Sequence, residues 1–302
     1  MIEPVLSDDS FLADVEAVRA RAGHVDLWWL GQSGFLIHHR GRWVLVDPYL
    51  SDSLTVKYAK TDKPHVRMGG RVIGPAKLAR GIGQSITITS SHAHTDHLDP
   101  DTLGPLVNFG IVDKIIAPRA ALETAIERSN ASKTQRPPTF EGADARSGHQ
   151  IGAGIKVNAV AAAHDTIERD AAGNCRFLGY VFEFSPFAPD ARGEVWMLEK
   201  EFTIYHSGDT IVYDGMVDQL RPFKIDIAIL PINGKVGNMN GADAARLAKD
   251  IGAKLVIPCH YDMFEFNTAD PADEFVPECQ RLGQPYRVLQ LGERFSSTEI
   301  PR

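Results

Sequence analysis

The sequence predicts an α/β protein whose two halves are built alike. Each half begins with short β-like runs joined by tight turns and continues with strands that alternate with helices. The run at residues 225–230 is apolar almost throughout, which is typical of a strand in a sheet covered on both faces. Histidine and aspartate residues directly follow several predicted strands. Because sites are commonly built by loops at strand ends, this pattern indicates a functional edge.

The N-terminal part of the chain predicts a helix followed by a meander of strands. Apolar side chains recur at helical spacing within residues 8–21. Three short strands are predicted next, at residues 25–30, 35–39 and 43–46. Gly41 provides the turn between the last two strands. His38 and His39 lie beside that turn, and we expect them to face solvent.

Residues 51–80 show no clear periodicity and contain several glycines and prolines, so a long loop is expected there. Lys57 and Lys60 belong to a run of cationic side chains in this loop. The run could form a lid that meets an anionic substrate, with these two lysines as substrate-binding residues. It could equally be an ordinary solvated loop, and the sequence leaves both interpretations open.

The rest of the chain alternates between predicted strands and helices. Strands are expected at residues 86–89, 114–117, 151–160, 177–184, 201–206, 225–230, 255–258 and 286–291. Helices are expected at residues 119–128, 242–250 and 272–282, with another that begins near Pro100. Residues 130–142 are polar and contain prolines, so we expect them to form a connection between elements.

Composition limits the classes of protein to consider. The length of 302 residues fits one domain over residues 1–302, with residues 1–22 as an N-terminal helical extension. No run approaches the ~18 apolar residues of a membrane-spanning helix, and we expect no signal peptide. The three cysteines are scattered, which argues against a disulfide framework and for a cytoplasmic location. The net charge of −7 argues against binding to nucleic acids or anionic membranes.

The densest group of polar side chains is the segment SHAHTDH at residues 91–97, directly after a β-like run. A helix would point His92 and His94 ~200° apart, because each residue turns by ~100°. A flat strand would leave His97 on the face opposite to Asp96. Only a tight loop gathers all four, and a divalent metal ion is the partner that such donors need. The alternative is a solvated, histidine-rich turn.

Other donors at predicted strand ends extend this segment. His164 follows a run of small residues, Asp209 follows a Ser-Gly turn, and His260 follows the strand at residues 255–258. Two metal sites can be assembled, with His92, His94 and His164 as ligands of the first and Asp96, His97 and His260 as ligands of the second. Asp209 could bridge both ions.

Such a pair of sites supports hydrolysis without a side-chain nucleophile. Two cations ~3.5–4 Å apart that share a hydroxide make a nucleophile available at neutral pH. Asp96 and Asp209 are therefore candidate catalytic residues as well as ligands. The sequence contains neither a Gly-x-Ser-x-Gly nor a Gly-x-Gly-x-x-Gly stretch, so serine hydrolases and Rossmann enzymes lack support.

Several other polar residues could assist this site. Asp47 precedes the proline that ends a strand, where it could cap the next turn or orient a metal ligand. His206 is expected to support the site or the fold without binding metal. Tyr261 could donate a hydrogen bond to a developing oxyanion, or it could be a packed loop tyrosine. Asn238 and Asn267 are candidates for substrate binding, with ordinary loop positions as the alternative.

The order of these residues resembles the metallo-β-lactamase superfamily. The resemblance rests on HAHTDH at residues 92–97, on Asp47 before it, and on His164, Asp209 and His260 after it, which together cover most of the chain. It implies a four-layer αββα sandwich with a dinuclear site at one edge of the two sheets. It also implies the same two ligand sets as above, with Asp209 as the bridge and Asp47 as the supporting aspartate.

Within the superfamily, three stretches are similar to the L-ascorbate-6-phosphate lactonase group: residues 27–31, 205–209 and 242–270. That group implies two Zn or Mn ions per chain, a small-molecule substrate, a cytoplasmic location and a homo-oligomer. The leading expectation is a lactonase that acts on a sugar-type lactone, with or without a phosphate group. This chain is shorter in regions that would select the substrate. The resemblance therefore supports the metal chemistry more strongly than it supports a particular substrate.

Three alternatives to a lactonase remain. The first is a phosphodiesterase, similar to RNase Z or to N-acyl-phosphatidylethanolamine phospholipase D. The second is a flavodiiron-like redox protein, although that group tends to carry glutamate where His94 stands. The third is a non-catalytic scaffold, and the intact set of candidate ligands argues against it because unused buried charge is costly.

Overall fold

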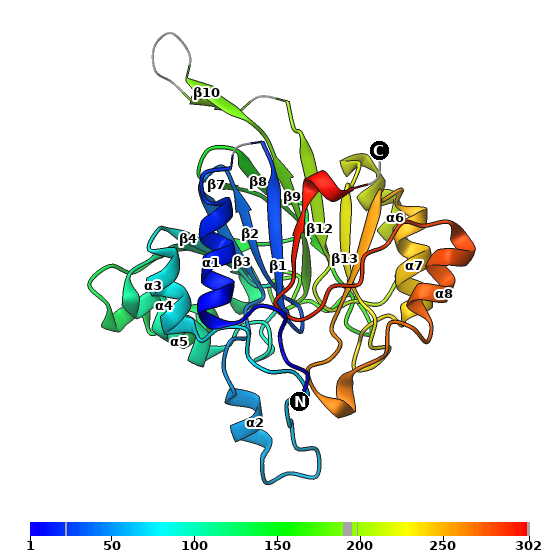
Figure 1. Ribbon diagram of the computed structural model, residues 1–302, viewed down its shortest axis with the longest axis horizontal. Coiled ribbons are helices and arrows are strands. Elements are labelled where there is room, and N and C mark those ends of the chain that lie inside the picture. The colour runs from blue at the N-terminus through cyan, green and yellow to red at the C-terminus, as the bar shows by residue number, and fades with distance from the viewer. Residues whose placement is uncertain (22, 190–194, 198, 301–302) are drawn as a thin grey trace.

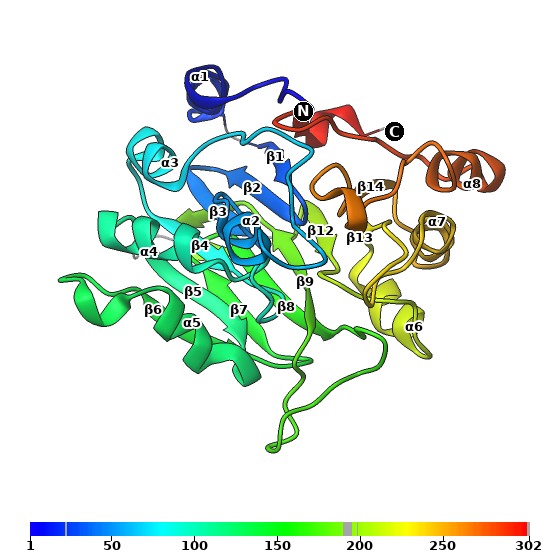
Figure 2. The ribbon, with the colours of Figure 1, turned by 90° about the horizontal axis from the view of Figure 1, so that it is seen from below.

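The computed structural model describes residues 1–21, 23–189, 195–197 and 199–300. Two β-sheets lie between two layers of helices (Figures 1 and 2). The helices are α1 (Asp8–Val18), α2 (Ser53–Tyr58), α3 (Pro75–Ile82), α4 (Pro100–Phe109), α5 (Leu122–Arg128), α6 (Met216–Leu220), α7 (Gly241–Asp250) and α8 (Phe275–Leu282). In Figure 2, α1, α3, α4 and α5 cover one side of the sandwich and α6, α7 and α8 cover the other. The predicted αββα architecture is confirmed.

The first sheet has seven strands in the order β15-β1-β2-β3-β4-β5-β6. Its strands are β1 (Val25–Gly31), β2 (Gly34–His39), β3 (Arg42–Val46), β4 (Ile86–Thr89), β5 (Val112–Pro118), β6 (Thr139–Ala143) and β15 (Arg294–Ser296). β1, β2 and β3 form the predicted antiparallel meander, whereas β3 to β6 run parallel. Parallel neighbours need crossover connections, and α3, α4 and α5 provide them.

The second sheet has six strands in the order β14-β13-β12-β9-β8-β7. Its strands are β7 (Gly148–Ile151), β8 (Ile155–Ala161), β9 (Leu178–Phe184), β12 (Phe202–His206), β13 (Ile227–Pro231) and β14 (Leu255–Cys259). β7, β8, β9 and β12 are antiparallel, and β12, β13 and β14 are parallel. Both halves therefore pass from antiparallel to parallel pairing. A hairpin of β10 (Phe187–Pro189) and β11 (Val195–Met197) projects from one end (Figure 1).

The N-terminal helix belongs to the outer helical layer. Phe11, Val15 and Val18 of α1 are buried, at the spacing that places them on one face of a helix. The ring of Phe11 meets Trp28 of β1 edge-on at 6.2 Å, and the indole of Trp28 donates a hydrogen bond to Asp14. These contacts pack α1 against the first sheet. Among the described residues, no helix is both long enough and apolar enough to span a membrane.

The prediction of one long loop over residues 51–80 was wrong at both ends of the stretch, and residues 59–74 connect the two helices found there. Two helices occupy this stretch, α2 and α3, and both are short enough to escape a periodicity search. Gly74 caps the N-terminus of α3 and Pro75 stands in its first turn, so two of the residues that suggested a loop mark a helix boundary, and Gly83 ends the helix with a φ of 56°. α2 projects below the sheets as part of a protruding segment (Figure 1).

Three other local predictions were wrong. His38 and His39 are buried, because both faces of the sheet are covered and His38 stacks on Trp43 at 4.3 Å. The connection expected at residues 130–142 contains the start of β6, which pairs with β5. The strand expected at residues 286–291 makes a single bridge to β14, because the chain there crosses to the first sheet and forms β15.

Candidate metal centre

The strand ends that carry the predicted ligands meet at one edge of the two sheets. In the first sheet, β3 and β4 run parallel, so Asp47 and the loop at residues 90–97 leave the same edge. In the second sheet, β8, β12 and β14 point in one direction. His164, Asp209 and His260 follow the carboxyl ends of these strands. Because the two sheets stack on each other, all these donors lie at the same edge of the sandwich.

The seven candidate ligands form one cluster, which we call the metal cluster. Its members are His92, His94, Asp96, His97, His164, Asp209 and His260. They fall into three overlapping groups whose ligand atoms lie within 4.8 Å of one another: His92, His97 and Asp209; His94, His164 and Asp209; and Asp96, His97 and His260. The last group is the second site expected from the sequence. Among the described residues, His92, His94 and His164, the first site expected from the sequence, do not form one group by themselves. Asp209 belongs to two of the three groups, and so does His97, so the bridging role of Asp209 stays a prediction.

The spacing of the donor atoms fits shared metal ions better than hydrogen bonds. Nε2 of His97 lies 3.3 Å from Oδ1 of Asp209 and 3.6 Å from Oδ2 of Asp96. Nε2 of His260 lies 3.5 Å from Oδ1 of Asp209. Two ligands bound tetrahedrally at ~2.0–2.1 Å stand about 3.4 Å apart, which matches these distances.

Unpaired polar atoms in the metal cluster point to the same conclusion. Within the described residues, the buried Nε2 atoms of His92, His97 and His164 have no hydrogen-bond partner. The buried Oδ1 of Asp209 has none either. Buried polar atoms almost always have partners, and leaving several unpaired in one small volume is costly. The nitrogen and carboxylate donors therefore fit divalent ions that accept these lone pairs, and such ions are what these residues would hold.

Asp47 orients the cluster from outside. Its Oδ1 accepts a hydrogen bond from the backbone N–H of Ser91 at 2.7 Å, and its Oδ2 accepts one from the Ser91 hydroxyl at 2.6 Å. Nδ1 of His97 donates to the same Oδ2 at 2.7 Å. This bond turns Nε2 of His97 toward the metal cluster. Of the two roles considered for Asp47, the geometry supports the orientation of a metal ligand.

Burial and mutual charge set the protonation of the cluster. Burial lowers the pKa of His92 well below its usual value, and the neighbouring His97 lowers it further. Burial would also lower the pKa of His97, but Asp209, Asp96 and Asp47 together raise it well above its usual value. Burial opposes ionisation of Asp209, yet His97 and His260 hold its pKa well below the usual range. The three carboxylates therefore favour the protonated form of His97, and a metal ion bound at Nε2 would compete with that proton.

His206 supports the turn that presents Asp209. Its Nε2 donates to the carbonyl oxygen of Ser33 at 2.9 Å, and its Nδ1 accepts from the N–H of Gly208 at 3.2 Å. A Cβ on Gly208 would lie 2.5 Å from Cβ of Ser91, and Gly208 has a φ of 60°. Only glycine fits this close approach of the two loops. His206 therefore acts on the fold around the site.

The proposed oxyanion role of Tyr261 is contradicted by the structure. The Tyr261 hydroxyl is buried and donates a hydrogen bond to the carbonyl oxygen of Leu289, and its ring lies against Trp29 at 4.3 Å. The side chain lines a different hollow from the one beside the metal cluster. Adjacency to His260 was misleading, since neighbouring residues in a chain can point in different directions.

The two candidate asparagines differ in position. Asn267 lines the cavity beside the metal cluster, and its Oδ1 accepts a hydrogen bond from Asn233 at 2.7 Å. Asn238 does not line that cavity. Its Oδ1 accepts a hydrogen bond from the N–H of Thr210 at 2.9 Å, so it holds the segment that follows Asp209. Only Asn267 is placed to meet a substrate.

The metal cluster opens into a cavity of about 330 Å³. The cavity is lined by Leu54, Lys57, Tyr58, His65, Ala93, His94, Thr95, Asp96, Arg128, Asp209, Val236, His260, Phe264, Phe266 and Asn267. One wall comes from a segment that we call the flap, residues 53–68, which includes α2. Lys57 lines the cavity and Lys60 does not, so the structure separates the two lysines that the sequence grouped together.

The flap is fastened at its base. The guanidinium of Arg67 donates to the carbonyl oxygen of Ser51 at 2.6 Å and lies over the ring of Tyr49. Within the flap, the hydroxyl of Thr55 donates a hydrogen bond to the carbonyl oxygen of His65 at 2.5 Å. The ring of His65 then lies 4.4 Å from Phe266, which holds the flap against residues near His260 in the chain. The flap is therefore an ordered wall.

Three residues important to the site were missed in the sequence. Nε2 of Gln32 donates to Asp96 at 2.9 Å and lies 3.0 Å from Nε2 of His260. A Cβ on Gly237 would lie 2.4 Å from the ring of His164, so this glycine lets a loop pass behind the ligand. Arg128 lines the cavity. Of these three residues, only Gly237 lies in a glycine-rich stretch, which could have indicated a tight loop.

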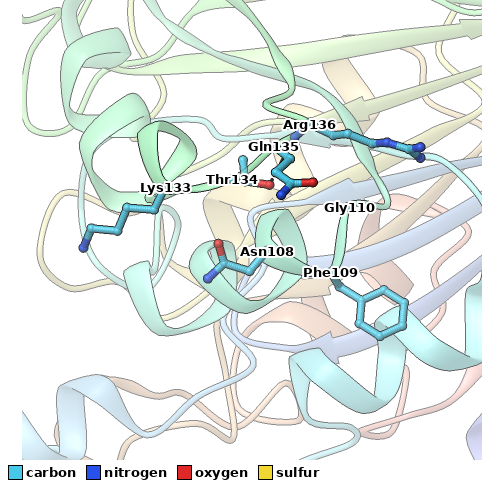
Figure 3. A pocket seen from close by; sticks show the side chains of 7 residues that line it. All are labelled: Asn108, Phe109, Gly110, Lys133, Thr134, Gln135 and Arg136. Carbon is cyan, nitrogen blue, oxygen red and sulfur yellow. Dashed lines mark hydrogen bonds between the residues drawn. The ribbon is translucent and has the colours of Figure 1, made fainter.

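A larger hollow of about 620 Å³ lies elsewhere on the surface. It is lined by Asn108, Phe109, Gly110, Lys133, Thr134, Gln135 and Arg136 (Figure 3). Lys133 and Arg136 point away from each other in this view. Among the residues that the structure describes, the lining contains no histidine or carboxylate that could bind a metal ion. Size alone therefore does not identify the functional site.

The chain is similar in sequence to proteins named as metal-dependent hydrolases. One from Rubrobacter xylanophilus is 27% identical over 288 residues, which are 93% of this chain and 100% of that protein. One from Anoxybacillus flavithermus is 42% identical over 91 residues, which are 30% of this chain and 38% of that protein.

Solved structures show the same fold at low sequence identity. Igni18, a metallo hydrolase from Ignicoccus hospitalis, has a TM-score of 0.61 and 20% identity, over 90% of this chain and 98% of that one. An isothiocyanate hydrolase from Delia radicum gut bacteria has a TM-score of 0.64 and 19% identity, over 90% and 100%. CmlA, a diiron β-hydroxylase from Streptomyces venezuelae, has a TM-score of 0.61 and 15% identity, over 91% of this chain and 54% of that one.

A sequence profile of the family described as a beta-lactamase superfamily domain matches residues 26–260. The match begins in β1 and ends at His260, so it contains every member of the metal cluster. It covers most of the chain, and the fold agrees with it. The protein therefore belongs to the beta-lactamase superfamily, with the metallo-β-lactamase fold.

Proposed function

We propose that this protein is a metal-dependent hydrolase that opens a lactone or cleaves a related carboxylic ester. The observation that carries the proposal is the metal cluster, in which Asp209 is shared between two donor groups beside an open cavity. Two divalent ions, Zn or Mn, would lower the pKa of a water molecule enough for attack near neutral pH and would polarise the scissile carbonyl. The names of the sequence relatives support hydrolysis.

The side chains around the metal cluster would hold the candidate metal ligands in position. Asp47 holds His97 in the tautomer that presents Nε2, and Gln32 holds Asp96. His94 is exposed to the cavity, so the group it helps to bind faces an incoming substrate. Among the described residues, the cavity lining contains no serine or cysteine, which is consistent with water as the nucleophile.

The size of the cavity supports a small substrate. Pockets that take small molecules measure ~300–1,000 Å³, and this one lies at the lower end of that range. A sugar-type lactone would fit such a volume, with its polar groups near Asn267 and Lys57. A phosphodiesterase and a redox enzyme on the same fold are the competing activities, and an activity panel separates them.

The test uses protein loaded with Zn or with Mn and assays lactones, carboxylic esters, thioesters and phosphodiesters. We expect about two metal equivalents per chain and turnover of lactones or esters. His94→Ala should abolish that turnover while the far-UV circular dichroism spectrum stays unchanged. Turnover of phosphodiesters with none of any lactone or ester would overturn the proposal, and so would a failure to take up metal.

A further inference from the structure

Arg128 occupies an unusual position at the end of α5. Its Nη1 donates hydrogen bonds to the carbonyl oxygens of Ala93 and Leu98, at 2.7 and 3.0 Å. These residues lie within and just after the loop that presents four of the candidate metal ligands. The side chain also lines the cavity. The guanidinium is therefore held in a fixed position beside the metal cluster.

Most of the hydrogen-bonding capacity of Arg128 is unused. In the part of the chain that the structure describes, its Nε and Nη2 have no hydrogen-bond partner, and no carboxylate oxygen lies within 4.0 Å of the guanidinium. Burial lowers the pKa of Arg128, and the attraction of Asp99 and Glu127, whose carboxylates lie beyond 4.0 Å, offsets this only in part. A guanidinium is suited to bind a carboxylate or a phosphate through two parallel hydrogen bonds.

Another part of the cavity wall is aromatic and apolar. The rings of Tyr58 and His65 stack at 4.1 Å, and His65 lies 4.4 Å from Phe266. Phe264 and Val236 also line the cavity. Such a surface suits the flat face of a ring, whether aromatic or a sugar ring presenting its C–H groups.

The charge of the cavity favours an anion as well. Its only carboxylates, among the described lining residues, are the candidate ligands Asp96 and Asp209. Two bound divalent ions would outweigh them, and Lys57 and Arg128 add further positive charge. A cavity of one sign attracts ligands of the other and concentrates them at its mouth.

We propose that Arg128 is a specificity-determining residue that binds an anionic oxygen group of the substrate while the flap wall receives the ring beside it. The substrate class is a small cyclic molecule with a carboxylate or a phosphate group. This inference rests on the proposed hydrolase function for the identity of the reaction, but the binding preference itself can be measured without turnover.

The test measures the binding of three probes to zinc-loaded protein by isothermal titration calorimetry. Benzoate and phenyl phosphate carry an anionic group beside a ring, and benzyl alcohol is their neutral counterpart. Arg128→Gln should weaken the binding of benzoate, of phenyl phosphate or of both by about ten- to hundredfold, since one charge-assisted pair is lost. The probe with the larger loss identifies the group that Arg128 selects. Benzyl alcohol should bind equally well to both proteins.

Arg136→Gln is the matched control. It removes the same charge from the hollow in Figure 3, which lies apart from the metal cluster, and all three probes should bind as they do to the unmodified protein. Arg128→Lys keeps a positive charge and should retain part of the anion affinity. Metal content and melting temperature of each variant show whether the loop at residues 91–97 is intact.

Three outcomes would overturn the inference. They are failure of the unmodified protein to bind either anion, equal anion binding by Arg128→Gln, and an equal loss for anionic and neutral probes, which would mean that Arg128 only fastens the metal loop. A kinetic comparison of dihydrocoumarin with its 6-carboxylate separates this inference from the proposed function. Lactone turnover without dependence on Arg128 rejects the inference alone, and Arg128-dependent anion binding without any ester or lactone turnover rejects the function alone.

Discussion

The metal cluster and the flap bound the same cavity, but the chain holds them in different ways. His92, His97 and His260 are almost fully buried at the edge of two sheets, and Asp47 fixes the loop that carries the first two. The flap rests on a separate small apolar cluster of Tyr49, Leu54, Met263 and Phe264. The sheet edge therefore holds the candidate metal ligands, whereas side chains of the flap can be replaced without disturbing the main hydrophobic core.

We therefore expect the largest effect on metal content and turnover from a change at Asp209, the residue expected to bridge the two metal ions. Asp209→Asn replaces by a neutral amide the carboxylate that belongs to two of the three groups, so metal content should fall below one ion per chain. Turnover should fall on the order of 10³-fold or more, since several kcal/mol of charge stabilisation are lost. Elemental analysis and steady-state kinetics measure both effects. Asp165→Asn, at an exposed neighbour of His164, is the control and should behave like the unmodified protein.

A change just outside the metal cluster should have the next largest effect. Asp47→Asn replaces one acceptor oxygen by an amide donor and cannot satisfy both Ser91 and His97. We expect metal affinity to drop by about 10- to 100-fold, the usual range for a residue that orients a ligand. Competition with a chelator measures this affinity. Asp62→Asn, on the exposed surface of the flap, should leave it unchanged, and an equal drop in both variants would contradict the role of Asp47.

The loop behind His164 gives a smaller and more local effect. Gly237→Ala places a Cβ 2.4 Å from the His164 ring at a φ of 75°, so both the ligand and the backbone are strained. Gly173→Ala has a similar φ of 87° with nothing nearby, and isolates the backbone cost of about 1–2 kcal/mol. Only the first should also weaken metal binding, by about tenfold. Identical metal affinities of the two variants would show that the contact with His164 has no effect.

The flap should give the smallest effect, and one confined to the substrate. Lys57→Gln removes an exposed charge that lines the cavity, which should raise KM for an anionic substrate by up to about fivefold and leave its neutral analogue unchanged. Lys60→Gln removes a charge from the same segment outside the cavity and should change neither value. Equal shifts for both variants would mean that the flap acts only through long-range charge.

The candidate metal donors that the structure brings together are those that the sequence places directly after strands. HAHTDH at residues 92–97 and the isolated His164, Asp209 and His260 are recognisable because each follows a local pattern of apolar residues. Gln32 and Arg128 were missed because their partners are remote in sequence. Gln32 meets Asp96 across 64 positions, and Arg128 meets Ala93 across 35. Tyr261 was misjudged because adjacency in sequence says little about where a side chain points.

The sequence by itself determined the fold class and the set of candidate metal donors, because strand periodicity and the residues that end strands are local properties. Only the tertiary structure decided which lysine faces the cavity, that Asp47 turns His97 toward the cluster, and that an arginine with unused donors stands beside it. These features depend on how two sheets and a flap pack together. Contacts between segments far apart in the chain decide them, and no local pattern of residues records such contacts.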